Sequence, residues 1–184
     1  MKQNTQNQTI DKLFIPQRTQ PPHRGHVSML ESACRMADEV VIGIGSANKY
    51  DAKNPYTADE RQMMLDYSLQ QRGVSNYRFI QVPDFETDSD WIDYVTEYAE
   101  MDENSKVVSG NPWVDQIFGE RGYETIDSFE LASEKIDISA TRLRGMIVDN
   151  DPQWREYAAS GTLHYFENFG GADRIARFYQ DKAA

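Results

Sequence analysis

His23 and His26 stand three positions apart and are the residues best suited to act on a bound phosphate group. On the first turn of a helix this spacing places both imidazoles on one face, where they can reach the same anion. Gly25 between them has no Cβ and lets the backbone approach a ligand closely. Arg18, shortly before the pair, adds a fixed positive charge. The spacing alone also fits surface residues or a metal site, so those interpretations stay open.

A second candidate anion site lies near Ser139, Thr141 and Arg144. Ser139 and Thr141 precede the apolar residues of 143–148, so hydroxyl side chains stand where a helix begins. The unpaired N–H groups and the dipole at a helix start attract anions. Arg144 falls in the first turns of this helix and can point back toward its start. A solvent-exposed helix arginine is the alternative reading.

Both sites require an α/β framework. Residues 13–15 can form a short buried strand, Pro21-Pro22 excludes helix, and an apolar pattern at helical spacing restarts at Val27. The loop containing the histidines therefore joins the carboxyl end of a strand to the start of a helix. Ligands bind at that position in open α/β sheets.

The remaining pattern predicts further strands and helices. Residues 39–45 form a nearly continuous apolar run, which is typical of a parallel strand covered on both faces. Thr57 and Glu60 form a capping box before a helix at 58–71, in which Met63, Met64 and Leu65 should point partly inward. Three more strands are expected at 77–82, 106–109 and 123–126. Further helices are expected near 91–95, at 114–118, at 141–148 and beyond Pro152, the last group broken at Gly170-Gly171, with 127–137 as a connection.

The stretch Arg18-x-Gln20-Pro21-x-His23-Arg24-Gly25-His26 resembles the (H/T)xGH signature of the nucleotidyltransferase superfamily, in the form seen in archaeal-type nicotinamide mononucleotide (NMN) adenylyltransferases. Four more stretches agree with that family in order and spacing: 44–47 with 54–61, 82–85 with Trp91, 109–112, and 138–144. The resemblance implies a Rossmann-like, doubly wound parallel sheet, here of about five strands, with a helical C-terminal segment. It also implies assembly as a homo-oligomer.

The implied reaction is adenylyl transfer from ATP to NMN, giving NAD and pyrophosphate, in which the enzyme mainly positions groups and stabilises charge. The implied catalytic residues are His23, His26 and Arg144, with His26 nearest the transition state. The implied ATP-binding residues are Arg18, Thr19, Gln20, Gly25, Gly110, Asn111, Ser139 and Thr141, with Gly110 and Asn111 on the adenine side. Magnesium would bridge phosphate oxygens and water, with no metal ligand from the protein.

The implied NMN-binding residues are Lys53, Asp84, Asp88 and Trp91, with Trp91 stacking on the cationic nicotinamide ring. Two positions depart from the family pattern. Gln17 replaces the usual glycine and could narrow the approach of phosphate, and Asp88 replaces the usual asparagine. A carboxylate can accept a hydrogen bond from the nicotinamide amide but cannot donate one, and its charge disfavours nicotinic acid mononucleotide.

Two rival functions remain at this stage. The first is an adenylyltransferase for another phosphorylated acceptor such as phosphopantetheine, against which Trp91 and the Gly110-Asn111 pair favour NMN. The second is a nucleotide sensor without turnover, which Gln17 keeps open.

Composition limits the partners and the compartment. The chain has 184 residues, enough for one domain with a substantial core. Its net charge of −11 argues against nucleic acid or an anionic membrane as a partner, because both are negatively charged and bind to basic protein surfaces. The single cysteine, Cys34, cannot form an internal disulfide, and we expect it to be buried.

We expect no segment that would direct the chain to a membrane or to secretion. No apolar run is long enough to cross a membrane, and residues 1–9 lack the apolar core of a signal peptide. We therefore expect a cytoplasmic protein with a disordered tail at residues 1–9 and a single domain at residues 10–184.

Overall fold

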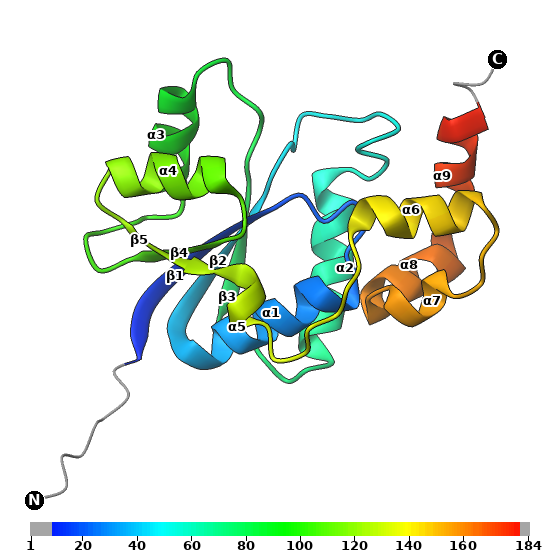
Figure 1. Cartoon of the computed structure of the whole chain (residues 1–184), viewed down its shortest axis with the longest axis horizontal. Coiled ribbons are helices and arrows are strands. Elements are labelled where there is room, and N and C mark those ends of the chain that lie inside the picture. Colours follow the sequence, from blue (N-terminus) through cyan, green and yellow to red (C-terminus); the bar gives the residue numbers. More distant parts are fainter. Residues whose placement is uncertain (1–8, 181–184) are drawn as a thin grey trace, which may run out of the picture.

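The computed structural model describes residues 9–180 and has a five-stranded parallel sheet at its centre (Figure 1). The strands are β1 (Ile10–Gln17), β2 (Ala37–Ile44), β3 (Tyr77–Gln81), β4 (Lys106–Ser109) and β5 (Glu124–Asp127). Their order in the sheet is β3-β2-β1-β4-β5, and all four neighbouring pairs are parallel. The direction of winding reverses between β1 and β4, and doubly wound sheets bind ligands in the crevice at that point. The expected Rossmann-like sheet is confirmed.

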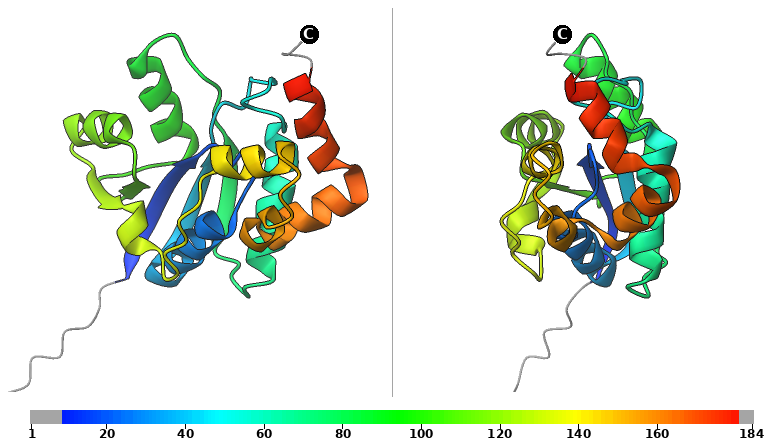
Figure 2. Two further views of the ribbon diagram at one scale, coloured as in Figure 1. Left: turned by 45° about the vertical axis from the view of Figure 1, so that its right-hand side comes forward. Right: turned by 90° about the vertical axis from the view of Figure 1, so that its right-hand side faces the viewer.

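Helices connect the strands and extend beyond the sheet. They are α1 (Arg24–Met36), α2 (Ala58–Gln70), α3 (Asp88–Tyr98), α4 (Pro112–Glu120), α5 (Ser128–Leu131), α6 (Ala140–Val148), α7 (Trp154–Tyr157), α8 (Ser160–Phe169) and α9 (Gly171–Gln180). Helices α6 to α9 gather beside α2, at the opposite side of the molecule from α3 and α4 (Figure 2). Within the described residues, no helix combines the length and apolarity needed to cross a membrane.

Alternation along the central strands divides the core into two layers. Leu13 and Ile15 are fully buried against α1 and α2, whereas Phe14 between them is fully buried against α3 and α4. Successive side chains of a strand point to opposite faces, so an all-apolar strand requires a helix layer on each face. A third cluster joins α2 to α6–α9 through Met64, Tyr165 and other residues.

Most local predictions are confirmed, and two need correction. The Thr57–Glu60 capping box forms, with the Thr57 hydroxyl accepting from the Glu60 amide at 3.3 Å. Met63 is 51% exposed, because Met64 and Leu65 already fill the two buried sides of α2 and Met63 falls on the outer side. The connection expected at 127–137 contains a short helix, α5. Cys34 is buried, as expected. The predicted disordered tail falls, apart from Thr9, outside the described residues.

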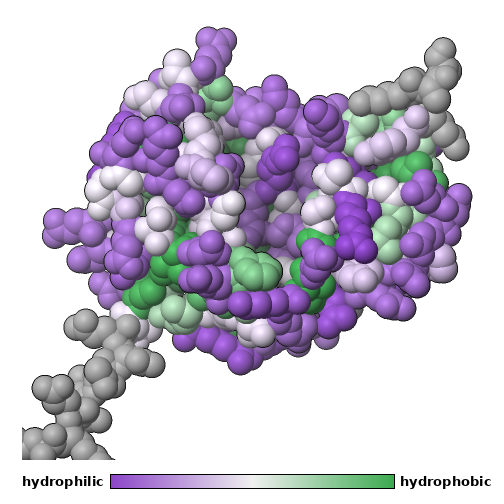
Figure 3. Space-filling model, in the orientation of Figure 1, coloured by the Kyte–Doolittle hydropathy of each residue, from purple (hydrophilic) through white to green (hydrophobic). Residues whose placement is uncertain are grey.

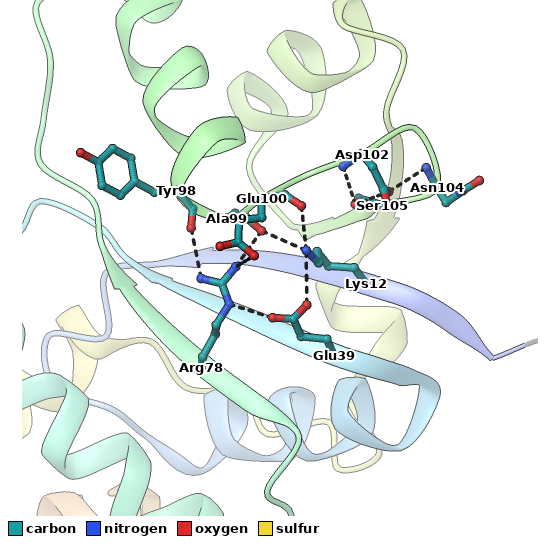
Figure 4. Close-up of polar contacts among 9 residues, drawn as sticks. All are labelled: Lys12, Glu39, Arg78, Tyr98, Ala99, Glu100, Asp102, Asn104 and Ser105. Carbon is teal, nitrogen blue, oxygen red and sulfur yellow. Dashed lines mark hydrogen bonds and ion pairs between the residues drawn. The ribbon is translucent and has the colours of Figure 1, made fainter.

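A polar cluster at the amino ends of the strands fixes α3. Lys12 on β1, Glu39 on β2 and Arg78 on β3 lie side by side, and Glu39 pairs with both cations (Figure 4). Arg78 donates to the carbonyl oxygens of Tyr98 and Ala99 at 3.1 and 2.9 Å, and Lys12 donates to that of Glu100 at 2.7 Å. These are unpaired carbonyl groups at a helix C-terminus, where positive charge is favourable. The opposite end of α3, which carries Asp88 and Trp91, is thereby held over the carboxyl ends of the strands.

Candidate active site

The two histidines cap α1 reciprocally. His23 is the N-cap, and its Nδ1 accepts from the His26 amide at 3.3 Å, while the Nδ1 of His26 accepts from the His23 amide at 3.1 Å. The two rings stack, with centroids 3.5 Å apart and planes at 24°. Since each Nδ1 accepts a hydrogen bond, each neutral ring carries its proton on Nε2. Both Nε2–H groups therefore remain available as donors.

Burial determines the charge of this pair. It lowers the pKa of His23 to about 4. It also lowers the pKa of His26 well below its usual value, and the nearby His23 lowers that pKa further. Both rings are thus neutral at neutral pH. They can donate hydrogen bonds to an anion without bringing a positive charge of their own.

Cationic side chains line a neighbouring cavity of about 600 Å³, here called the basic cavity. Its lining comprises Arg18, Thr19, Gln20, His26, Lys53, Ser139, Ala140, Thr141, Arg144 and Tyr179. The surface is hollowed between α4 and α6 in the view of Figure 3. The basic cavity unites the histidine loop with the start of α6, so the two predicted anion sites form one. Among the described residues that line it, none is a carboxylate.

Arg144 is held with a donor to spare. It is 6% exposed and donates through Nη1 to the carbonyl of Gln20 at 2.6 Å and through Nη2 to the hydroxyl of Thr141 at 3.3 Å. Its Nε is buried and has no hydrogen-bond partner among the described residues. The hydroxyl of Thr19, whose φ is 44°, is in the same state. Buried polar atoms without partners are costly, and an anion in the basic cavity would satisfy such donors.

The start of α6 has the expected capping geometry. The Ser139 hydroxyl accepts from the amide of Arg142 at 3.1 Å, and Ala140 and Thr141 occupy the first helical positions. No acidic side chain stands in this first turn. The helix therefore presents the positive end of its dipole to the basic cavity without a carboxylate in its own first turn.

A second cavity of about 560 Å³ carries three of the residues implied for NMN, Asp84, Asp88 and Trp91. It is here called the indole cavity because Trp113 lines it as well. The ring centroids of Trp91 and Trp113 are 5.0 Å apart and the planes meet at 59°. Arg18 lines this cavity and the basic cavity, so the two adjoin at that residue.

Two acidic side chains of the indole cavity are fixed by hydrogen bonds. Asp84 accepts from the Ser46 hydroxyl at 2.9 Å. Asp88 accepts from the indole N–H of Trp113 at 3.1 Å. Lys53, which was also predicted to bind NMN, lines the basic cavity instead.

A third, smaller cavity of about 220 Å³ lies on the other side of the histidines and is here called the apolar cavity. His23, Gly25 and His26 line it together with five apolar residues, Met29, Phe129, Ala132, Ile136 and Ile138, and with four polar or charged ones, Gln17, Ser128, Glu134 and Lys135. A Cβ on Gly25 would come within 3.1 Å of His23 Nδ1, so this glycine makes room for the stacked rings. His26 lines both the apolar and the basic cavity.

Three of the predicted residues have surroundings that sequence did not anticipate. The Gln20 side chain is 3% exposed and its amide exchanges two hydrogen bonds with the backbone of Tyr56, at 2.8 and 3.0 Å. It therefore ties the histidine loop to the loop that carries Lys53. Asn111 caps α4 and lines the indole cavity, not the apolar one. Gly110 lines none of the three cavities, and a Cβ there would stand 2.7 Å from the hydroxyl of Ser128.

Sequence reasoning missed Arg61, Trp113 and Tyr179 as parts of the site. Arg61 is fully buried, and burial lowers its pKa to about 10. Its guanidinium donates to the carbonyls of Arg18 and Gly45, at 2.7 Å each, and so ties together the ends of β1 and β2. The available signal was an arginine on the apolar side of α2, between Ala58 and Leu65. Tyr179, on the last helix, gave no comparable signal.

The sequence is similar to a described family and to several named enzymes. A family model described as cytidylyltransferase-like matches residues 18–162. The nicotinamide-nucleotide adenylyltransferase of Pyrobaculum neutrophilum is 36% identical over 169 residues, covering 90% of this chain and 93% of that protein. The enzyme of the same name from Pyrococcus furiosus is 35% identical over 167 residues, covering 89% of this chain and 86% of its own.

Solved structures show the same fold. A bifunctional NMN adenylyltransferase/ADP ribose pyrophosphatase from Francisella tularensis, in complex with AMP and manganese, matches with a TM-score of 0.71 at 20% identity. The match covers 92% of this chain, which spans about half the length of that bifunctional protein. The extent and identity of the sequence matches establish that the chain belongs to the nicotinamide-nucleotide adenylyltransferases, within the cytidylyltransferase-like family.

Proposed function

We propose that this chain transfers the adenylyl group of ATP to nicotinamide mononucleotide, forming NAD and releasing pyrophosphate. The observation that carries the proposal is that three cavities adjoin one another. The apolar cavity meets the basic cavity at His26, the basic cavity meets the indole cavity at Arg18, and Gln17 lines both the apolar and the indole cavity. An adenosine, a chain of phosphates and a pyridinium nucleoside would occupy them in that order.

Each cavity suits the chemistry of its occupant. The apolar cavity offers Phe129, Ile136 and Ile138 to a flat purine ring. The basic cavity offers cationic and hydroxyl donors to the phosphates of both substrates. The indole cavity offers aromatic faces and carboxylates to a cationic ring, which an indole attracts through its quadrupole.

The chemistry requires a bond exchange at the α-phosphorus of ATP. A phosphate oxygen of NMN forms the new bond there, while the bond from the α-phosphorus to the bridging oxygen breaks and pyrophosphate leaves with that electron pair. Negative charge grows on the transferring group and on the departing pyrophosphate. Neutral His26 would donate from Nε2 to the α-phosphate, and Arg144 would donate to the departing group from its unpartnered Nε.

Arg18 and Lys53 would act by position. Arg18 borders the basic and indole cavities, so its charge can hold the acceptor phosphate next to the α-phosphate. Lys53 would neutralise the same phosphate from the loop that Gln20 anchors. Ser139 and Thr141 would bind the terminal phosphates at the start of α6.

The surroundings fit a magnesium ion that is carried by the phosphates. The basic cavity presents guanidinium, ammonium, imidazole and hydroxyl groups, and in residues 9–180 no three His, Cys, Asp or Glu side chains are grouped closely enough to hold a metal. Triphosphate oxygens and water would therefore be its ligands. When bound, it would supply charge neutralisation to the pyrophosphate.

The proposal is tested by incubating the protein with ATP, magnesium and one acceptor at a time, and measuring pyrophosphate and the dinucleotide product. NMN should yield equal amounts of NAD and pyrophosphate. Pyrophosphate formed with phosphopantetheine but not with NMN would reject the proposed acceptor. Tight binding of NAD without pyrophosphate at any metal concentration would identify a sensor instead of an enzyme.

The expected homo-oligomer and cytoplasmic location remain predictions. Sedimentation of the purified chain measures the first, and a monomer at all concentrations would contradict it. Fractionation of cells that produce the chain measures the second.

A further inference from the structure

Trp113 donates a hydrogen bond to Asp88, but neither the family resemblance nor the proposed reaction gives Trp113 a role. Trp113 is the second residue of α4, and its backbone is fixed by Pro112 at the first helical position and by the Asn111 cap. Despite its size, the indole is 38% exposed and lines the indole cavity instead of the core. The structure thus holds a large aromatic side chain at the mouth of a binding cavity.

The bond joins the starts of two helices. Trp113 Nε1 donates to Asp88 Oδ2 at 3.1 Å, and Asp88 is the first residue of α3. An indole N–H can only donate, so the oxygen it contacts must be an acceptor, and the start of α3 favours negative charge. The hydrogen bond holds the Asp88 side chain in one orientation. Its second oxygen is left to accept from a ligand.

The charges around Asp88 make this orientation selective. Asp84 and Asp88 both line the indole cavity, and Arg18 is the one cationic side chain among the described residues that do. A cationic ring bearing a carboxamide would be attracted and could donate its amide N–H to Asp88. A ring bearing a carboxylate would meet Asp88 with like charge and no proton to donate.

We propose that Trp113 is a specificity-determining positioning residue, which holds the Asp88 carboxylate where it accepts from a nicotinamide carboxamide and repels nicotinate. This inference deepens the proposed function and rests on it. The ring planes of Trp91 and Trp113 meet at 59°, so the two indoles form a corner beside Asp88. This corner would restrict the rotation of a bound pyridine ring away from Asp88.

The test compares NMN with nicotinic acid mononucleotide as acceptors in the wild-type chain and in Trp113→Phe, which keeps an aromatic ring but removes the N–H. The wild-type chain should prefer NMN. The variant should lower the ratio of kcat/KM values, NMN over the acid, by about tenfold, mainly through a higher KM for NMN. The KM for ATP should stay unchanged. Equal changes with both acceptors would assign Trp113 a packing role only and overturn the proposal.

Asp88→Asn supplies a second arm. Removal of the charge should raise kcat/KM for nicotinic acid mononucleotide, and adding Trp113→Phe to that variant should change the ratio less than it does in the wild-type chain, because the Trp113 N–H then positions a neutral acceptor. Independent, additive effects would contradict the proposal. Tyr67→Phe is the matched control, since Tyr67 is 37% exposed and lines none of the three cavities.

The same assay distinguishes a failure of the proposed function from a failure of the role proposed for Trp113. A wild-type chain that releases no pyrophosphate with either acceptor rejects the proposed function. A wild-type chain that is active while Trp113→Phe leaves the acceptor ratio unchanged rejects this inference alone. Thermal unfolding of Trp113→Phe should match that of the wild-type chain, because the side chain is partly exposed.

Discussion

The guanidinium of Arg61 is hydrogen-bonded to the backbone of Arg18, with Nη1 donating to the Arg18 carbonyl at 2.7 Å. The same guanidinium donates to Gly45 at 2.7 Å and, from Nε, to Thr57 at 3.2 Å. A fully buried cation is stable here because several carbonyl groups surround it. It fixes the end of β1 from which Arg18 reaches two cavities.

Arg61→Met should therefore destabilise the fold strongly. The substitution leaves several buried carbonyl groups without donors, and we expect a loss on the order of 3 kcal/mol in the free energy of unfolding. Arg61→Lys keeps the positive charge but has fewer N–H donors. Its free energy of unfolding should lie between those of Arg61→Met and the wild-type chain. Urea unfolding measures both variants. A free energy for Arg61→Met close to that of the wild-type chain would show that the carbonyl groups find other partners.

Stability should fall in mild acid because of the buried histidines. Burial lowers the pKa of His23 to about 4 in the folded chain, whereas the pKa of an unfolded histidine is near 6.5. Between these values the unfolded state binds more protons, so lowering the pH favours unfolding, and the contribution of a neutral His23 is present above pH 6.5 and lost toward pH 4. The loss should be on the order of 3 kcal/mol.

His23→Asn isolates that contribution, because asparagine preserves an N-cap acceptor but does not titrate. The free energy of unfolding of this variant should depend less on pH between 6.5 and 4. Parallel curves for variant and wild type would mean that His23 is not the titrating group.

The cluster that fixes α3 should contribute modestly. The hydrogen bonds that Glu39 accepts from Arg78 and Lys12 outweigh the effect of burial and lower its pKa. Arg78→Met removes two donors from the end of α3 and should cost about 1 kcal/mol, since the side chains are partly exposed. Denaturant unfolding in low and high salt measures it. An effect that persists undiminished in high salt would argue against a charge contribution.

A substitution of Lys53 shows whether this residue binds the phosphate of NMN or the triphosphate of ATP in the basic cavity. Lys53→Ala should raise the KM for NMN by about tenfold while the KM for ATP changes little, if its charge holds the acceptor phosphate. Steady-state kinetics with each substrate varied in turn measures both constants. The reverse pattern would assign Lys53 to the triphosphate.

Sequence predicted the framework and the two helix starts that border the basic cavity, because both depend on local pattern. The apolar strands, the Thr57–Glu60 capping box and the two helix starts at His23 and Ser139 are written in residues close together in the chain. Their convergence follows from the topology of a parallel sheet.

The features that sequence missed depend on distant contacts. The Trp113–Asp88 bond joins residues 25 positions apart, and Arg61 contacts carbonyl groups 43 and 16 positions away. No pattern within one segment predicts such pairs. Asn111 lines the indole cavity, and its place on the adenine side stays a prediction of the family resemblance.

The central claim is that neutral His26 stabilises charge on the α-phosphate as the transition state forms. His26→Ala should lower kcat by roughly a hundredfold or more while the KM for ATP moves little. Arg24→Ala is the neighbouring control, since Arg24 is exposed and pairs with Glu134, and it should retain near wild-type kinetics.

The decisive measurement is kcat and the KM for ATP of His26→Ala under saturating NMN. The account predicts a large fall in kcat at nearly constant KM. A raised KM with kcat unchanged would contradict it and make His26 a residue that only binds ATP in the ground state.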